Sequence, residues 1–236
     1  MRLISDASDL NGVNIHFLDS LHESDPALVP ILVCPGLSET AEEYEDFIAD
    51  MLPRRTVVLS FRGRGGSGTP ATGYDLQDHV MDIDAIVRRT GLAQFHLYGY
   101  SRGVSYALAY ARLHPHLIVT LIVQDYPAEH KAMTAEWARA YIDEYLVPTG
   151  RLSQIRAEAV YGIHRDSTAA SLAFPFDKPV LVLRGLLPDA LIPEDALLPY
   201  KMHFSRLSIV DFGESGHNIR GTEKEKLDRT ISDFIT

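Results

Sequence analysis

The stretch that decides the fold is Phe95-His96-Leu97-Tyr98-Gly99-Tyr100-Ser101-Arg102-Gly103. It joins an apolar run to a G-x-S-x-G pentapeptide, and a helix-compatible run, residues 104–113, follows directly. Small residues two positions either side of Ser101 suit a strand that turns sharply into a helix, because that turn strains the serine backbone and crowds its neighbours. Such a turn lifts the Ser101 hydroxyl clear of a sheet, where a base and a substrate carbonyl can both reach it. The stretch therefore predicts a nucleophile elbow, with Ser101 as the nucleophile.

Apolar runs alternate with longer helical patterns along the rest of the chain, as in the βαβ units that build a parallel sheet. Their β-branched and leucine content suits strands that are covered on both faces. The expected strands are residues 30–34, 56–61, 94–98, 119–124, 179–183 and 206–212, with residues 13–18 pairing antiparallel at the N-terminal edge. The predicted fold class is α/β, with a mostly parallel central sheet and helices on both faces.

Two helices can be placed together with their ends. Between the second and third parallel strands, one apolar stripe at helical spacing is formed by Leu76, Val80, Ile83 and Val87. We expect this helix to begin after Asp75 and to end at a left-handed cap on Gly91. Near the C-terminus, Thr222-Glu223-Lys224-Glu225 matches the capping-box pattern and predicts a helix capped by Thr222. The apolar face of that helix carries Leu227, Ile231, Phe234 and Ile235.

One segment interrupts the alternation. Residues 126–176 contain no convincing strand but show helical spacing on either side of the turn Pro148-Thr149-Gly150. We expect a core formed by residues 1–125 and 177–236, with a small helical cap insertion at residues 126–176. Its aromatic side chains either pack the insertion against itself or line a substrate pocket, and the pocket candidates are Trp137, Tyr141 and Tyr145.

Composition argues against several kinds of partner. With 22 Lys and Arg against 32 Asp and Glu, the formal net charge of −10 disfavours binding to nucleic acid. No apolar run reaches the roughly 18 residues of a membrane span, and the N-terminus lacks the apolar core of a signal peptide. We therefore expect a cytoplasmic protein without nucleic-acid or membrane partners. The single cysteine, Cys34, ends a predicted buried strand and is expected to belong to the core.

A base for Ser101 has to come from ten histidines. His217 is the best candidate, because it lies in a flexible turn after the last predicted strand, and such loops converge on the ligand crevice of an α/β sheet. The base needs an acid that fixes its tautomer and stabilises the imidazolium. Asp189, in the loop after the strand at residues 179–183, is the preferred acid, and Asp125, at the end of the preceding strand, is the alternative.

We expect neither a cofactor nor a metal. Gly63, Gly65 and Gly68 fit the spacing of a dinucleotide-binding loop, but residues 69–73 separate them from the next helix, whereas that loop runs directly into its helix. The sequence has no H-E-x-x-H motif and no paired cysteines at ligand spacing.

The chain order Ser101, Asp189, His217 resembles that of the α/β-hydrolase family, and the resemblance covers nearly the whole chain. Residues 62–68 (R-G-R-G-G-S-G) resemble the R-G-x-G-x-S segment of that family, and Gly216-His217 resembles its catalytic G-H pair. The helical insertion falls where family members carry a cap.

The resemblance also implies an oxyanion hole. In the family it uses the backbone N–H after the nucleophile and one from the loop after the third strand, which here are the N–H groups of Arg102 and Leu37. This chain reads Pro35-Gly36 where the family commonly has H-G, and so it lacks a histidine that usually supports the loop.

The expected function is that of a cofactor-free serine hydrolase of the carboxylesterase type. Ser101, deprotonated by His217 with Asp189 behind it, attacks a small or medium, largely apolar carboxylic ester, thioester or lactone, and water then cleaves the acyl-enzyme. Carbon–carbon bond hydrolysis and perhydrolysis use the same triad in the family and remain alternatives. The serine counts against the dehalogenase and epoxide hydrolase members, which have an aspartate there. A non-catalytic ligand receptor with a hydrolase-like shell is the alternative from another class.

Overall fold

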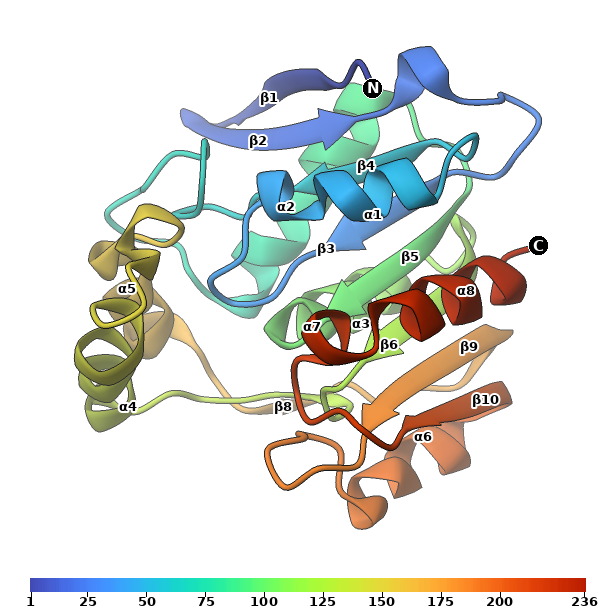
Figure 1. Cartoon of the computed structure of the whole chain (residues 1–236). Coiled ribbons are helices and arrows are strands. Elements are labelled where there is room, and N and C mark those ends of the chain that lie inside the picture. The colour runs from blue at the N-terminus through green and yellow to red at the C-terminus, as the bar shows by residue number, and fades with distance from the viewer.

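A single eight-stranded sheet runs through the centre of the molecule (Figure 1). The computed structural model describes residues 1–236. The strand order is β1-β2-β4-β3-β5-β6-β9-β10, and all neighbours from β4 onward are parallel. The strands are β1 (Ile4–Leu10), β2 (Val13–Asp19), β3 (Ile31–Cys34), β4 (Thr56–Leu59), β5 (Phe95–Tyr100), β6 (Ile118–Gln124), β9 (Phe176–Gly185) and β10 (Phe204–Phe212). The predicted α/β class with a mostly parallel sheet is confirmed.

The N-terminal edge differs from the prediction by one strand. β2 pairs antiparallel with β4, but β1 pairs with its other side, so β1 forms the edge and β2 is internal. The two strands are joined by Asn11 and Gly12, both with positive φ (53° and 86°), which is the geometry of a tight hairpin turn. An Asn-Gly pair between two strands is a known signal for such a turn, which the strand prediction above did not use.

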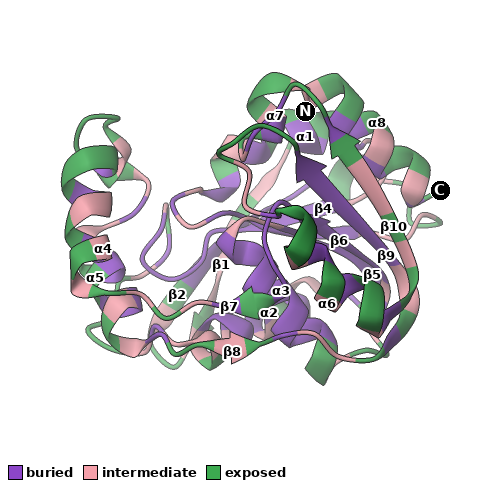
Figure 2. Ribbon diagram, turned by 90° about the horizontal axis from the view of Figure 1, so that it is seen from below, coloured by how far each residue is buried: buried purple, intermediate pink, exposed green.

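Helices cover both faces of the sheet, and Figure 2 shows the buried strands between them. One face is covered by α1 (Glu45–Asp50), α7 (Ile219–Thr222) and α8 (Lys224–Phe234), and the other by α2 (Leu76–Thr90), α3 (Arg102–Leu113) and α6 (Leu198–His203). Short 3-10 turns lie at Leu21–Glu23, Ala41–Tyr44, Arg151–Ser153 and Glu194–Leu197. Alternate residues of one strand enter different cores: Ile31 and Val33 face α1 and α8, whereas Leu32 and Cys34 face α2 and α3. None of the helices combines the length and the apolar character needed to span a membrane.

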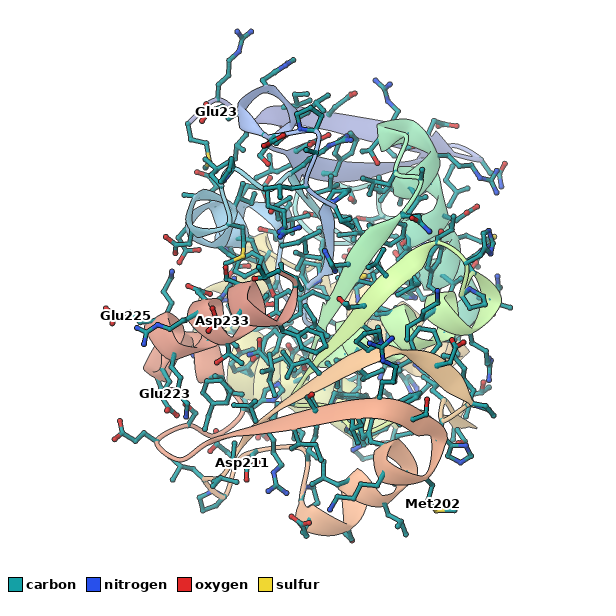
Figure 3. The ribbon with its side chains drawn as sticks, turned by 90° about the vertical axis from the view of Figure 1, so that its right-hand side faces the viewer. Glu23, Met202, Asp211, Glu223, Glu225 and Asp233 are labelled. Carbon is teal, nitrogen blue, oxygen red and sulfur yellow. The ribbon has the colours of Figure 1, made fainter.

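Part of the acidic surplus of the composition lies at the surface. Figure 3 shows the side chains of Glu225 and Asp233 on α8 and of Asp211 on β10, and all three are exposed. Cys34, in contrast, is fully buried in the core, and burial raises the pKa of its thiol far above the ordinary value. A neutral, inaccessible thiol fits the expected core role.

Helix α2 has both predicted ends. The Asp75 carboxylate accepts a hydrogen bond from the N–H of Asp78 at 2.8 Å, and Gly91 at the C-terminal end has a φ of 68°. The free N–H groups of the first turn thus find an acceptor, and the left-handed cap falls on a residue without a Cβ.

The capping box predicted at Thr222 is wrong. Thr222 is the last residue of α7, and α8 begins at Lys224 after Glu223, whose side chain makes no capping bond. The Glu223 carboxylate instead accepts hydrogen bonds from the Ser215 hydroxyl at 2.6 Å and the Glu214 N–H at 3.1 Å. The Thr222 hydroxyl, which the pattern assigned to the start of the helix, instead donates to the carbonyl of Asn218 at 3.0 Å and so belongs to α7.

The insertion between β6 and β9 stands at one side of the sheet (Figure 1). It contains β7 (Glu129–His130), α4 (Ala135–Ala140), a π-helical segment η3 (Tyr141–Leu146), α5 (Ala157–Asp166) and β8 (Ala170–Ser171). A separate small core joins the insertion to Tyr74, which lies before α2, and consists of Tyr74, Ala138, Ile142, Leu146, Ile155, Ala159, Val160 and Ile163.

The glycine-rich loop at residues 62–68 holds this insertion. The N–H of Gly65 donates to the carbonyl of Gln154 at 2.8 Å, and the N–H of Arg156 donates to the carbonyl of Gly63 at 3.1 Å. A Cβ on Gly63, whose φ is 77°, would lie only 2.2 Å from the Ala159 Cβ. The loop therefore needs glycine for close packing against α5.

Buried His96 makes stability depend on pH. It is 3% exposed, and its Nδ1 lies 2.8 Å from Thr120 Oγ1. Burial, with a smaller effect of Arg54, lowers the pKa of His96 to about 4. In the unfolded chain, histidine has a pKa of about 6.5, so between about pH 6.5 and about pH 4 the unfolded chain binds a proton at His96 and the folded protein does not. Stability is therefore lost as the pH falls from about 6.5 to about 4.

We predict that His96→Gln reduces the loss of unfolding free energy on acidification, by up to about 1.4 kcal/mol per pH unit. Urea unfolding of both proteins at about pH 7 and about pH 5 measures this difference. His22→Gln, at an exposed position, is the matched control and should keep the wild-type slope. Equal slopes for His96→Gln and wild type would contradict the prediction.

Candidate active site

Ser101 occupies the sharp turn between β5 and α3. Its backbone has a φ of 52° and a ψ of −133°, an unusual conformation for a residue with a side chain, and its N–H donates to the carbonyl of Gln124 at 3.0 Å. A Cβ at Gly99 would lie 2.8 Å from the Cα of Val104, and a Cβ at Gly103 would lie 2.2 Å from the carbonyl oxygen of Cys34. The strand-turn-helix geometry that the pentapeptide predicts is present, and both glycines are needed for it.

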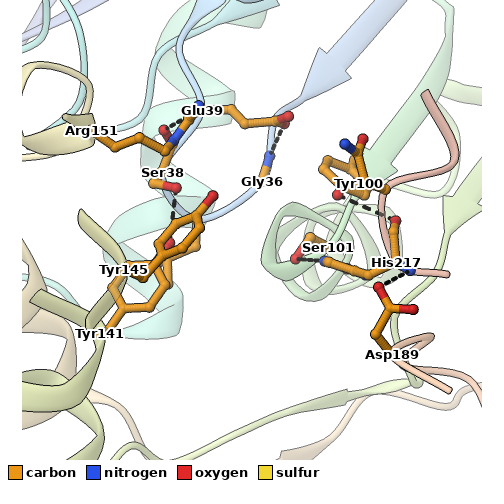
Figure 4. A pocket seen from close by; sticks show the side chains of 12 residues that line it. Gly36, Ser38, Glu39, Tyr100, Ser101, Tyr141, Tyr145, Arg151, Asp189 and His217 are labelled. Carbon is orange, nitrogen blue, oxygen red and sulfur yellow. Dashed lines mark hydrogen bonds between the residues drawn. The ribbon is translucent and has the colours of Figure 1, made fainter. Parts of the chain in front are cut away.

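His217 contacts Ser101 from the loop after β10. Its Nε2 lies 2.9 Å from Ser101 Oγ (Figure 4). The ring of Tyr100 stacks on the imidazole with a centroid distance of 5.1 Å, and the Tyr100 hydroxyl donates to the carbonyl of His217 at 3.3 Å. Burial raises the pKa of Tyr100, which keeps this donor protonated. The imidazole is therefore fixed in position against the serine.

Asp125 lies on the other side of the imidazole. Its Oδ2 is 2.8 Å from His217 Nδ1 and also accepts the N–H of Leu191 at 2.9 Å. The carboxylate is fully buried, and its second oxygen, Oδ1, has no hydrogen-bond partner in the protein. Asp125 directly follows β6 and has a φ of 47°. This turn directs the carboxylate toward the histidine.

Asp189, which the sequence analysis preferred as the acid, does not contact the imidazole in the structure. Its Oδ2 accepts the backbone N–H of His217 at 3.3 Å, as Figure 4 shows, and its carboxylate lies against Gly216. The reason is the path of the loop after β9: the N–H groups of Leu186 and Leu187 both donate to the carbonyl of Ser215. This loop therefore packs on the backbone of the loop that carries His217. The imidazole ring is contacted by Asp125 and not by Asp189.

The backbone N–H groups of Leu37 and Arg102 are both free of protein acceptors. The Leu37 loop lies against the start of α3, because Gly103 packs directly on the carbonyl oxygens of Cys34 and Pro35. The Arg102 side chain is buried and donates to the Ser167 hydroxyl at 2.7 Å. Only the backbone of Arg102 is thus available to a ligand at Ser101.

A cavity of about 500 Å³ opens over Ser101 (Figure 4). Its lining residues are Gly36, Leu37, Ser38, Glu39, Tyr100, Ser101, Tyr141, Tyr145, Arg151, Asp189, His217 and Asn218. No group of three or more His, Cys, Asp and Glu side chains is arranged to hold a metal ion.

The cavity contains two of the three predicted aromatic residues. Tyr141 and Tyr145 line it from the insertion, and the Tyr141 hydroxyl donates to Ser38 Oγ at 2.8 Å. Trp137 does not line the cavity, in contrast to the prediction, and stacks on the Tyr141 ring with a centroid distance of 5.3 Å. Helical spacing placed Trp137 and Tyr141 on one face, but only the second residue reaches the opening.

Sequence reasoning missed two charged lining residues, Glu39 and Arg151. Arg151 donates to the carbonyl of Ser38 at 2.8 Å and to the carboxylate of Glu43 at 2.7 Å. No local pattern marks these residues, because their partners are distant in sequence or lie within an irregular loop. Arg151 thus carries a positive charge from the insertion to the cavity wall, where it is already bonded to the segment that follows β3.

The strand order, with Ser101, Asp125 and His217 at the carboxyl ends of strands, is that of the α/β-hydrolase fold. The family model for the alpha/beta hydrolase fold matches residues 29–141. Solved structures of the same fold match almost the whole chain, so the family model and these structures agree on an alpha/beta hydrolase fold.

Curated proteins and solved structures resemble almost the whole chain. The sequence is 23% identical to 2-(acetamidomethylene)succinate hydrolase of Mesorhizobium japonicum over 85% of each chain. It is 24% identical to AB hydrolase superfamily protein YisY of Bacillus subtilis, over 87% of this chain and 91% of that protein. An esterase from Exiguobacterium antarcticum matches with a TM-score of 0.81 and 20% identity, over 98% of this chain and 99% of the esterase.

We predict that Gly103→Ala destabilises the protein, because its Cβ would collide with the carbonyl oxygens of Cys34 and Pro35. Overpacking costs about 1–3 kcal/mol, which exceeds the gain of about 1 kcal/mol for Ala over Gly in a helix. Urea unfolding measures the change. Gly213→Ala, where no atom lies within 4 Å of the added Cβ, is the control and should stay within about 0.5 kcal/mol of wild type. A Gly103→Ala protein as stable as this control would contradict the prediction.

Proposed function

We propose that this protein is a serine hydrolase that cleaves a carboxylic ester through an acyl-enzyme on Ser101. The observation that carries the proposal is the continuous contact from Ser101 Oγ to His217 Nε2 at 2.9 Å and from His217 Nδ1 to Asp125 Oδ2 at 2.8 Å. Ser101 and His217 line a cavity of about 500 Å³. A nucleophile, a base and an acid in this order are the elements that acyl transfer requires.

In the first half of the reaction, His217 takes the proton of Ser101 while Oγ attacks the ester carbonyl carbon. Asp125 accepts the hydrogen bond of Nδ1–H, which fixes the tautomer and stabilises the imidazolium. The tetrahedral intermediate then collapses, the bond to the leaving alkoxide breaks, and His217 returns its proton to that oxygen. Water repeats these steps on the acyl-enzyme and releases the carboxylic acid.

The free N–H groups of Leu37 and Arg102 are the proposed oxyanion hole. Both flank Ser101 without an acceptor of their own, so they can donate to the oxygen that becomes negative in the transition state. One such preorganised donor is worth about 3–4 kcal/mol. Because backbone groups serve here, side-chain substitutions act on them only by moving the loop.

The cavity supports a small or medium substrate. Tyr141 and Tyr145 offer ring surface for an apolar portion, while the charges of Glu39 and Arg151 are already engaged by protein partners. Relatives and structural neighbours named as hydrolases and esterases support the reaction class. We therefore propose that the protein is a cofactor-free carboxylesterase that acts on a small ester, thioester or lactone.

The first prediction from this proposal concerns Ser101. Hydrolysis of 4-nitrophenyl esters from acetyl to decanoyl should fall by about 10⁴- to 10⁶-fold in Ser101→Ala, because the nucleophile is lost. Labelling by a fluorophosphonate probe should disappear in the same variant. Ser153→Ala, with an exposed hydroxyl on the insertion, should keep both.

Two other outcomes favour the alternatives. Labelling of Ser101 without hydrolysis of any ester would point to lactone, carbon–carbon or peracid chemistry on the same triad. Absence of both labelling and hydrolysis in the folded protein would favour a non-catalytic ligand receptor.

The second prediction separates the two candidate acids. Asp125→Asn should lower kcat by about 10⁴-fold, because the amide no longer fixes the productive tautomer or stabilises the imidazolium. Asp189→Asn keeps an oxygen that can accept the His217 N–H and should lower kcat by less than about tenfold. Steady-state kinetics on the best ester measures both. A larger loss in Asp189→Asn would assign the acid to the other carboxylate.

A further inference from the structure

The loop that presents the Leu37 N–H is held by a carboxylate within the same loop. Glu39 Oε2 accepts the N–H of Gly36 at 2.9 Å, and the N–H of Glu39 donates to the carbonyl of Gly36 at 3.2 Å. Both backbone groups of Gly36 are therefore bonded to one residue. Without this partner, a glycine next to the nucleophile would have wide conformational freedom.

The bond to the Gly36 carbonyl determines where the Leu37 N–H points. Both groups belong to one planar trans peptide unit and point in opposite directions. Fixing the carbonyl on the Glu39 side therefore fixes the N–H on the other side. On the next peptide, the carbonyl of Leu37 accepts Arg64 Nε at 3.0 Å, so the two peptides around Leu37 are both restrained.

Glu39 is itself held by two partners from different parts of the chain. The Tyr44 hydroxyl donates to Oε2 at 2.6 Å, and Arg220 donates to Oε1 at 3.3 Å. The Arg220 guanidinium also lies over the Tyr44 ring, 3.9 Å from its centroid. Burial, with the neighbouring Glu39, raises the pKa of Tyr44 well above its ordinary value, so its hydroxyl remains a donor.

This network joins two parts of the site. Arg220 lies in α7, three residues after His217, whereas Glu39 lies in the loop after β3. The side chains of Glu39 and Arg220 are only 15% and 17% exposed, and Tyr44 is 1% exposed. Partial burial strengthens this ion pair relative to one in open water. The loop with the oxyanion donor and the loop with the base are therefore tied together by one charged pair.

We propose that Glu39 is a positioning residue that sets the direction of the Leu37 N–H, with Tyr44 and Arg220 holding Glu39 in place. This inference rests on the proposed serine hydrolase function. The Glu39 side chain acts through Gly36. Its carboxylate accepts the Gly36 N–H and so holds the glycine where its carbonyl meets the backbone N–H of Glu39. Both carboxylate oxygens are already engaged by the protein. Its loss should weaken binding of the transition state and leave binding of the ester unchanged.

The test measures kcat and KM of Glu39→Ala, Glu39→Gln and Tyr44→Phe on the best ester. Glu39→Ala should lower kcat by about 10- to 100-fold with KM unchanged, a part of the loss expected for one complete oxyanion donor. Glu39→Gln keeps an oxygen for the Gly36 N–H and should recover much of the loss. Tyr44→Phe keeps the ring under Arg220, removes one bond to Glu39, and should show a smaller fall in kcat. Glu45→Gln, at an exposed position one residue further on, is the control.

A second measurement separates positioning from general structural damage. Affinity for a trifluoromethyl ketone, which forms an oxyanion on Ser101, should fall in parallel with kcat in Glu39→Ala, whereas affinity for the product carboxylic acid should not change. An unchanged kcat in folded Glu39→Ala, or a change in KM alone, would overturn this inference while wild-type activity upholds the hydrolase. A wild-type protein that neither hydrolyses esters nor reacts with the fluorophosphonate would overturn both.

Discussion

The close approach of α3 to the end of β3 is the contact on which the site depends. Gly103 lies so near the carbonyl oxygens of Cys34 and Pro35 that no Cβ fits between them. This approach brings the N-terminus of α3, with Ser101 and the Arg102 N–H, next to the loop that carries Leu37. Since both elements belong to the packed interior, the relative position of the proposed nucleophile and the proposed oxyanion donors is set by the core of the sheet and not by flexible side chains.

The remaining groups reach this point from the neighbouring strands. In the order β3-β5-β6-β9-β10, Ser101 follows β5, Asp125 follows β6, and His217 follows β10. The loop after β10 therefore extends past the ends of β9 and β6 to bring His217 to Ser101. Asp125, at the end of β6, contacts the imidazole from its other side. A carboxylate without exposure is costly unless it is hydrogen-bonded, and Asp125 has the imidazole and the Leu191 N–H on one oxygen. The contact that serves the proposed chemistry thus also satisfies Oδ2 of the buried carboxylate, whereas Oδ1 has no partner in the protein.

The sequence predicts well where the structure is determined locally. The elbow and the ends of α2 follow from residue types at short spacing, and they appear as expected. The acid could not be chosen this way, because Asp125 and Asp189 both follow buried strands and the choice depends on how the loop after β9 packs on Ser215. The lining by Glu39 likewise depends on contacts across the fold that no local pattern records.

The loop after β3 also connects the insertion to the site. Ser38 accepts the Tyr141 hydroxyl through its side chain and Arg151 through its carbonyl, and both of these partners come from the insertion. Next to Ser38, Leu37 and Glu39 carry the proposed oxyanion donor and its support. The loop is therefore restrained from the insertion, from Arg64 and from Arg220 at once. Because preorganised donors need no rearrangement as charge develops, a loop restrained from three directions is well suited to stabilise an oxyanion. By the same contacts, the insertion is linked directly to the loop that lies beside Ser101.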